Sequence, residues 1–285
     1  LDTFTRDNLS EEDRLQTSSY LSEAWDSWKE IITKNRNKIS DLKIDNYINN
    51  LGKLTEKFDG DTAKLAKSEG LIDTLIVRTN LNDYLSSLVE EKIISFKDNL
   101  ALLNNENSSD NKFAVLVASG EIIDGEYAEG AISSENFSKT LNKIDKDKSI
   151  KGLFLRVNSP GGSALASDVI LRELNIAKQK KKIIVSMGDY AASGGYYISC
   201  NADKIFANST TLTGSIGEFG IIPNTQKLLN EKIGVYIDTV NTHKYSDLGR
   251  GNRKLTKYEL DVIQNSIKDV YDTFIKHVSN GRGIS

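Results

Sequence analysis

The sequence predicts an α/β fold with a mostly parallel sheet, preceded by a largely helical N-terminal region. Two observations support this prediction. After residue 111, short apolar runs typical of buried strands alternate with amphipathic stretches of helical period. Before residue 104, helical patterns dominate. Because parallel strands need long crossover connections, the alternation of strands and helices indicates a parallel sheet.

The N-terminal region begins with an amphipathic helix predicted over residues 9–35. Leu21, Trp25 and Trp28 recur at helical spacing, and Ser10 is followed by acidic residues that suit a helix start. Three further elements are predicted: a helix over 61–70, a short strand over 71–76 and a helix over 80–103. The polar stretch NNENSSDN, residues 104–111, is typical of a linker between domains.

The remaining elements belong to the α/β region. Strands are predicted at 113–118, 152–157, 182–186 and 204–207, and helices at 134–144, 164–179 and 256–279. We therefore expect three parts: a mostly helical segment over 1–103, the linker, and an α/β domain over 112–285.

The composition excludes several classes of function. The formal charge is −3, with 37 basic and 40 acidic residues, so nucleic acid is not an expected partner. The longest apolar run is Phe113–Ala118, too short to cross a bilayer. Cys200 is the single cysteine, which excludes an internal disulfide and a cysteine-based zinc site. We expect neither a metal nor a cofactor.

The chain is expected to be a piece of something longer, because it starts with Leu1 and its single methionine is Met187. An internal similarity supports this. An offset of 246 residues aligns 9–39 with 255–285, including the identical pair Asp26 and Asp272. The sequence would then hold the end of one repeat and most of a second, incomplete at its C-terminus.

Two glycine-rich segments are candidates for chemistry. VNSPGG, residues 157–162, follows a predicted strand, and its backbone N–H groups suit an oxyanion hole, although a plain turn is the alternative. YAASGGYY, residues 190–197, presents Ser193 between small residues at the start of a helix, which suits a nucleophile. A serine that merely packs in a tight turn is the alternative there.

The general base is harder to assign. The sequence contains two histidines, His243 and His277. We interpret His277 as structural from its place in the alignment of residues 9–39 with 255–285. His243 is one candidate. A neutral lysine is another, because burial lowers the pKa of a lysine.

Four ordered motifs resemble one family. VNSPGG, SMGDYAASGGYYIS, ADKIFA and TLTGSIG are similar to the signal peptide peptidase A family, Ser–Lys peptidases of the Clp/crotonase superfamily. The resemblance covers about 113–285 and implies a Clp/crotonase-like ββα superhelix. More loosely, FTRDNLS and EGLIDTL resemble the end of the first repeat in the long, duplicated form.

The resemblance implies roles for individual residues. Ser193 corresponds to the nucleophile, and Gly161 and Gly162 correspond to the oxyanion hole. Ser215, in TLTGS, corresponds to the serine that orients the lysine.

The lysine itself has two implied positions. The short form carries it directly before the aspartate that corresponds to Asp247, where this chain has Ser246. The long form carries the lysine in the first repeat, just upstream of the position of Leu1. We favour this second position for the general base. The repeat offset makes Lys244 the second candidate and leaves His243 as the third.

The implied function is a serine endopeptidase with a Ser–Lys dyad that degrades apolar peptides such as cleaved signal peptides. The family also implies a homo-oligomer on the periplasmic side of the bacterial inner membrane, anchored through a segment absent from this chain. Two alternatives remain: a crotonase-like acyl-CoA enzyme, and a catalytically incomplete assembly module.

Overall fold

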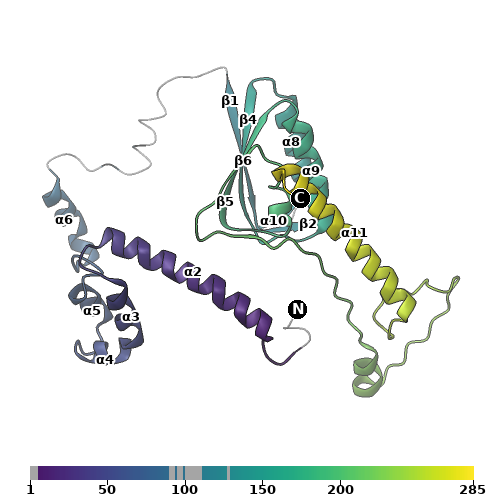
Figure 1. Ribbon diagram of the computed structural model, residues 1–285, viewed down its shortest axis with the longest axis horizontal. Coiled ribbons are helices and arrows are strands. Elements are labelled where there is room, and N and C mark those ends of the chain that lie inside the picture. The colour runs from purple at the N-terminus through teal and green to yellow at the C-terminus, as the bar shows by residue number, and fades with distance from the viewer. Residues whose placement is uncertain (1–5, 90–93, 95–98, 100–110, 127–128) are drawn as a thin grey trace. The chain divides into compact units, whose positions relative to one another are not determined.

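The computed structural model describes residues 6–89, 94, 99, 111–126 and 129–285. The chain divides into two compact units, residues 1–108 and 109–285. The first unit is helical, and within the described residues the strands all belong to the second (Figure 1). Residues 104–110 of the predicted linker lie outside the described residues, and the predicted domain boundaries stay predictions.

The helical unit begins with α2, Glu11–Asn35, close to the predicted bounds. Its N-cap is Ser10, whose hydroxyl accepts a hydrogen bond from the backbone N–H of Asp13 at 3.1 Å. In the second unit, α11, Lys257–Arg282, has Thr256 as its N-cap. The two caps are related by the same 246-residue offset that the sequence similarity gave, whereas the duplication itself stays a prediction.

Shorter elements complete this unit: α3 Asp41–Asn49, α4 Leu51–Glu56, α5 Thr62–Ser68, η1 Arg78–Asn80 and α6 Leu81–Leu88. The helix predicted over 61–70 is therefore confirmed, whereas α3 and α4 were not predicted. Such short helices depend on tertiary packing, here on the burial of Ile44 in α3. Of the helix predicted over 80–103, the only described element is α6, which ends where Val89 is extended. Most of the remaining predicted residues lie outside the described ones.

The strand predicted over 71–76 is wrong. Helix α5 ends in a Schellman motif, in which the Leu71 N–H donates to the Ala66 carbonyl at 2.9 Å and Gly70 adopts φ +80°. Leu71 is therefore the apolar residue that follows such a cap, and it packs against α3. No described strand of this unit is present for the segment to pair with.

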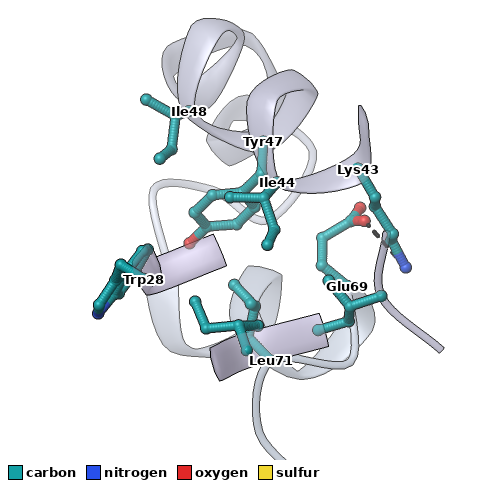
Figure 2. Close-up of a pocket in the computed structure, with 9 residues that line it drawn as sticks. Trp28, Lys43, Ile44, Tyr47, Ile48, Glu69 and Leu71 are labelled. Atoms are coloured by element: carbon teal, nitrogen blue, oxygen red, sulfur yellow. Dashed lines mark ion pairs between the residues drawn. The ribbon is translucent and has the colours of Figure 1, made fainter. Parts of the chain in front are cut away.

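An apolar hollow of about 380 Å³ lies between α3 and the end of α2 (Figure 2). Trp28, Ile44 and Leu71 face it, and a 3.5 Å ion pair between Lys43 and Glu69 lies at its side. The residues that line it include no serine, cysteine or histidine. This hollow is therefore no candidate for nucleophilic catalysis.

The α/β unit contains β1 Lys112–Ser119, β2 Glu121–Ile123, β3 Ala131–Ser133, α8 Ser134–Lys146, β4 Ile150–Ser159, α9 Ala164–Lys178, β5 Lys182–Ala192, α10 Gly194–Tyr197, β6 Lys204–Phe206, β7 Leu212–Gly214, η2 Leu228–Ile233 and α11. The main sheet has the order β1-β4-β5-β6, with β7 also pairing with β5, and β2 pairs with β3. Each of these pairs is parallel, as predicted. The three-residue strands β2, β3 and β7 were not predicted.

Helices α8 and α9 cover one face of the main sheet (Figure 1). The core between them includes Leu155, Val185 and Ile170, each fully buried. On the opposite face, Val115 and Val117 of β1 are 70% and 60% exposed. Parallel sheets are normally covered on both faces, so this face is a candidate contact surface.

Helix α11 is long and packs through its C-terminal half. Phe274 and Val278 are buried with Tyr197 and Cys200, which attaches this half to the region around α10. Within the part of the chain that the structure describes, no helix combines the length and apolarity that a membrane crossing requires.

Candidate active site

Both glycine-rich segments lie at the same edge of the sheet. VNSPGG includes the last residues of β4, and YAASGGYY includes the last residues of β5. These two parallel strands are neighbours, with Ser159 opposite Ala191. The carboxyl ends of adjacent parallel strands are where ligands bind in open α/β sheets. The tertiary structure thus brings the two predicted segments together.

Ser193 lies in the turn between β5 and α10. Its backbone angles are φ 50° and ψ −121°, a conformation that residues with a side chain rarely adopt. Its N–H donates to the Gly214 carbonyl at 2.9 Å, and its carbonyl accepts from the Tyr197 N–H at 2.9 Å. These two bonds hold the strained residue in place, while its side chain is only half-buried.

Gly161 packs directly against the nucleophile candidate. A Cβ atom at position 161 would lie 2.8 Å from the Ser193 Cβ and 2.7 Å from the Gly194 nitrogen. Its φ of +105° also disfavours any side chain. The glycine is therefore required for the approach of the β4–α9 turn to Ser193.

The two candidate oxyanion donors differ in their bonding. The N–H of Gly161 donates to the Ser159 hydroxyl at 3.2 Å. Ile122 of β2 bonds the Gly161 carbonyl and the Ser163 N–H, both at 2.8 Å. In a parallel bridge of this kind the N–H of the central residue, Gly162, faces away from the paired strand. Gly162 is thus the better placed of the two predicted donors.

Ser215 is brought next to Ser193 by β7. The β5–β7 register pairs Ala192 with Gly214, so the two serines follow paired positions. Ser215 also has a positive φ, 49°. The predicted nucleophile and the predicted orienting serine thus come together, although they are distant in the sequence.

A pocket of about 240 Å³ opens beside Ser193. It is lined by Gly162, Ala164, Ser167, Ser193, Gly194, Tyr197, Glu218, Val270 and Phe274. Glu218 is the single carboxylate in this lining, and burial raises its pKa, partly opposed by a hydrogen bond from the Phe219 N–H. No lysine or histidine is among these residues.

Lys244 lies elsewhere in the unit. It is exposed, and its Nζ lies 5.2 Å from the centre of the Tyr245 ring. The segment that contains it is attached to the start of α11, because Arg253 bonds Asp247 and Glu259 at once. The hydrogen bonds from Arg253 and Thr256 lower the pKa of Glu259 to about 2.

The length of α11 separates that segment from the pocket. Glu259 is in the first turn of α11, whereas Phe274, which lines the pocket, lies in its second half. At 1.5 Å per residue these two positions are roughly 22 Å apart along the helix axis. The structure therefore does not bring Lys244 to Ser193.

The two histidines also lie outside the lining. The His243 Nδ1 is 3.2 Å from the Thr242 hydroxyl, and the residue is exposed. The His277 Nε2 lies 3.4 Å from Asp168, and its ring is edge-on to Tyr197. This placement agrees with a structural role for His277.

Several residues in and around the pocket were not singled out from the sequence. Tyr197 donates to Asp168 at 3.0 Å, and burial, with the Asp168 charge, raises the pKa of its hydroxyl, which stays protonated at neutral pH. Tyr197 lies four residues after Ser193, a helical spacing that could have indicated it. No comparable pattern indicates Asp168 or Glu218, because they come from distant elements.

The thiol of Cys200 and possible metal ligands were compared with Ser193 among the described residues. Cys200 is buried, and burial raises the pKa of its thiol to about 11, which makes it unreactive at neutral pH. Among the described residues, no cluster of three or more histidine, cysteine or acidic side chains could hold a metal ion.

Comparison with protein families gives two matches. The model of peptidase family S49 matches residues 175–285, and the Clp protease model matches residues 104–213. Together the two matches include both glycine-rich segments and the turns around Ser193 and Ser215.

Individual relatives agree with these families. The chain is 36% identical to Protease 4 of Haemophilus influenzae over 295 residues, which covers all of this chain and 48% of that protein. It is 39% identical to a putative signal peptide peptidase SppA of Enterococcus faecium, covering 63% of this chain and 53% of that protein. It is 30% identical to the chloroplastic serine protease SPPA of Arabidopsis thaliana, covering 96% of this chain and 41% of that protein. The chain spans about half the length of these curated relatives.

Proposed function

The chain is a relative of the S49 peptidases, and from that premise we propose that it is a serine endopeptidase with Ser193 as its nucleophile. One observation carries this proposal. The half-buried Ser193 adopts a strained turn in contact with Gly161, beside a pocket. Strained residues of this kind cluster at active sites.

In the proposed first step, a neutral lysine accepts the proton of the Ser193 hydroxyl. The Oγ attacks the peptide carbonyl carbon, and the carbonyl π electrons move to oxygen. The protonated lysine then gives its proton to the leaving amine as the C–N bond breaks. Water, deprotonated by the same lysine, hydrolyses the ester and restores Ser193.

We propose that the oxyanion receives hydrogen bonds from the N–H groups of Gly162 and Gly194. Gly162 is supported by its orientation away from Ile122. Gly194 follows Ser193 directly and lies against Gly161. Fixed donors of this kind stabilise the transition state by about 3 kcal/mol each.

The lysine of the dyad is proposed to come from a segment other than Thr242–Asp247. The pocket lining contains no lysine, and the attachment of Asp247 to Arg253 keeps Lys244 at the far end of α11. The place of Ser215 beside Ser193 supports its proposed role of orienting that lysine.

The proposed substrates are apolar peptides such as cleaved signal peptides, at the periplasmic side of a bacterial inner membrane. This rests on the family resemblance and on relatives named signal peptide peptidase SppA. Cell fractionation tests the location: recovery of the protein from the cytoplasmic fraction alone would contradict it.

A serine-directed probe tests the nucleophile. A fluorophosphonate is expected to phosphonylate Ser193 in the full-length protein, so that mass spectrometry of the digest finds the adduct on that residue. A Ser215→Ala variant should label more slowly, because the lysine would be less well oriented. Labelling confined to other serines would reject the assignment.

We also propose a homo-oligomer in which the apolar face of β1 is covered. Val115 and Val117 are exposed on a parallel sheet that would normally be covered on both faces. Sedimentation velocity should show an assembly that a Val115→Glu, Val117→Glu variant weakens. A monomeric wild-type protein at micromolar concentration would contradict this proposal.

A further inference from the structure

The pocket beside Ser193 has a charge that the proposed apolar substrates do not explain. Of the residues that line it, Glu218 is the single one with a carboxylate, and the others are apolar, small or hydroxyl-bearing. Glu218 lies in the loop that follows β7 and Ser215. It lines the same pocket as Ser193 and Gly162.

Glu218 has no cationic partner in the described part of the chain. The causes that shift its pKa are burial and the Phe219 N–H, with no contribution from a lysine, arginine or histidine. Other carboxylates of this unit, such as Asp168 and Asp203, are paired with basic groups. A half-buried carboxylate without such a partner is costly unless a ligand supplies the charge.

Apolar and aromatic residues also line the pocket. They include Val270 and Phe274 of α11 and Tyr197. An apolar wall with a carboxylate nearby fits a lysine or arginine side chain, whose methylene stem packs on apolar groups while its head carries the charge. The pocket is narrow in this structure and has to widen to admit such a side chain.

We propose that this pocket is a subsite for a lysine or arginine side chain of the peptide substrate, with Glu218 as the specificity-determining residue. The inference rests on the proposed peptidase function. It adds a basic position to an otherwise apolar substrate.

The test uses a peptide set in which lysine or its uncharged analogue norleucine occupies each position in turn. With the full-length enzyme at pH 8, one position should favour lysine about tenfold in kcat/KM. Glu218→Gln should reduce this ratio to about one, and Glu218→Lys should favour glutamate at that position. Glu231→Gln, an exposed residue outside the pocket, is the matched control and should keep the wild-type ratio.

The pH dependence adds a second readout. Burial raises the pKa of Glu218, so lysine preference should be full at high pH and decline as the pH falls through that raised pKa. Because the raised pKa means that ionised Glu218 destabilises the fold, Glu218→Gln should raise the unfolding temperature at pH 8. At pH 4, where the carboxyl is protonated, the substitution should leave the unfolding temperature unchanged. A loss of lysine preference in that variant therefore would not reflect misfolding.

Binding separates this proposal from the peptidase assignment. Fluorescence anisotropy with a Ser193→Ala variant should show the same lysine preference without hydrolysis. If no peptide is hydrolysed but this preference depends on Glu218, the subsite stands and the peptidase proposal fails. If peptides are hydrolysed and the ratio is equal in wild type and Glu218→Gln at every position, the subsite is rejected.

Discussion

Replacing Ser193 with alanine is expected to lower kcat/KM for an apolar peptide by roughly a thousandfold or more in the full-length protein. The substitution removes the Oγ that would form the proposed acyl-enzyme. The backbone bonds from Ser193 to Gly214 and from Tyr197 to Ser193 do not involve the side chain. The fold should therefore persist, with an unchanged circular dichroism spectrum and unfolding temperature.

Ser209→Ala is the matched control, because Ser209 is exposed in the loop before β7 and outside the pocket. It should retain wild-type hydrolysis. Full activity of the Ser193→Ala variant would remove the proposed nucleophile and, with it, the proposed mechanism.

Replacing Gly161 with alanine is expected to have the second largest effect, because it disrupts both packing and chemistry. The new Cβ would lie within 3 Å of the Ser193 Cβ and the Gly194 nitrogen, at a φ of +105°. Overpacking and backbone strain together should lower the free energy of unfolding by about 3 kcal/mol. Hydrolysis should be lost as well, because Ser193 and the Gly194 N–H are displaced.

Denaturant unfolding and peptide hydrolysis measure the two effects. Gly52→Ala is the control, since Gly52 lies in α4 of the helical unit with nothing within 4 Å of its Cβ position. It should keep activity and be neutral or slightly stabilised. Wild-type stability and activity of the Gly161→Ala variant would show that the turn does not pack as described.

Strand–helix alternation predicted the α/β unit well, because the apolar period of each long element reflects its burial. β1, β4, β5, α8 and α9 all lie where the pattern indicated them. The pattern failed at 71–76, where Leu71 is apolar because it follows a helix cap. It also missed the three-residue strands β2, β3 and β7, which are too short to show a period of two.

Some residues of the candidate site could likewise be predicted from the sequence, and others could not. Ser193 and the VNSPGG turn could be chosen as candidates from local sequence, because a nucleophile and oxyanion donors require small neighbours and turns after strands. The roles of Gly161 and Gly162 individually came from the family resemblance. Ser215 was identified through the family resemblance alone. Neither the local sequence nor the family resemblance indicated Glu218, whose importance depends on a pocket formed by four segments distant in the sequence.

The sequence by itself determined the fold class, the family resemblance and the nucleophile candidate, because these depend on local periodicity and on short motifs. Only the tertiary structure decided which candidates meet. The parallel register of β4, β5 and β7 brings Gly161 and Ser215 to Ser193. The length of α11 and the bonds of Arg253 keep Lys244 away from it. Distances between residues remote in the chain are set by packing, and no local pattern encodes them.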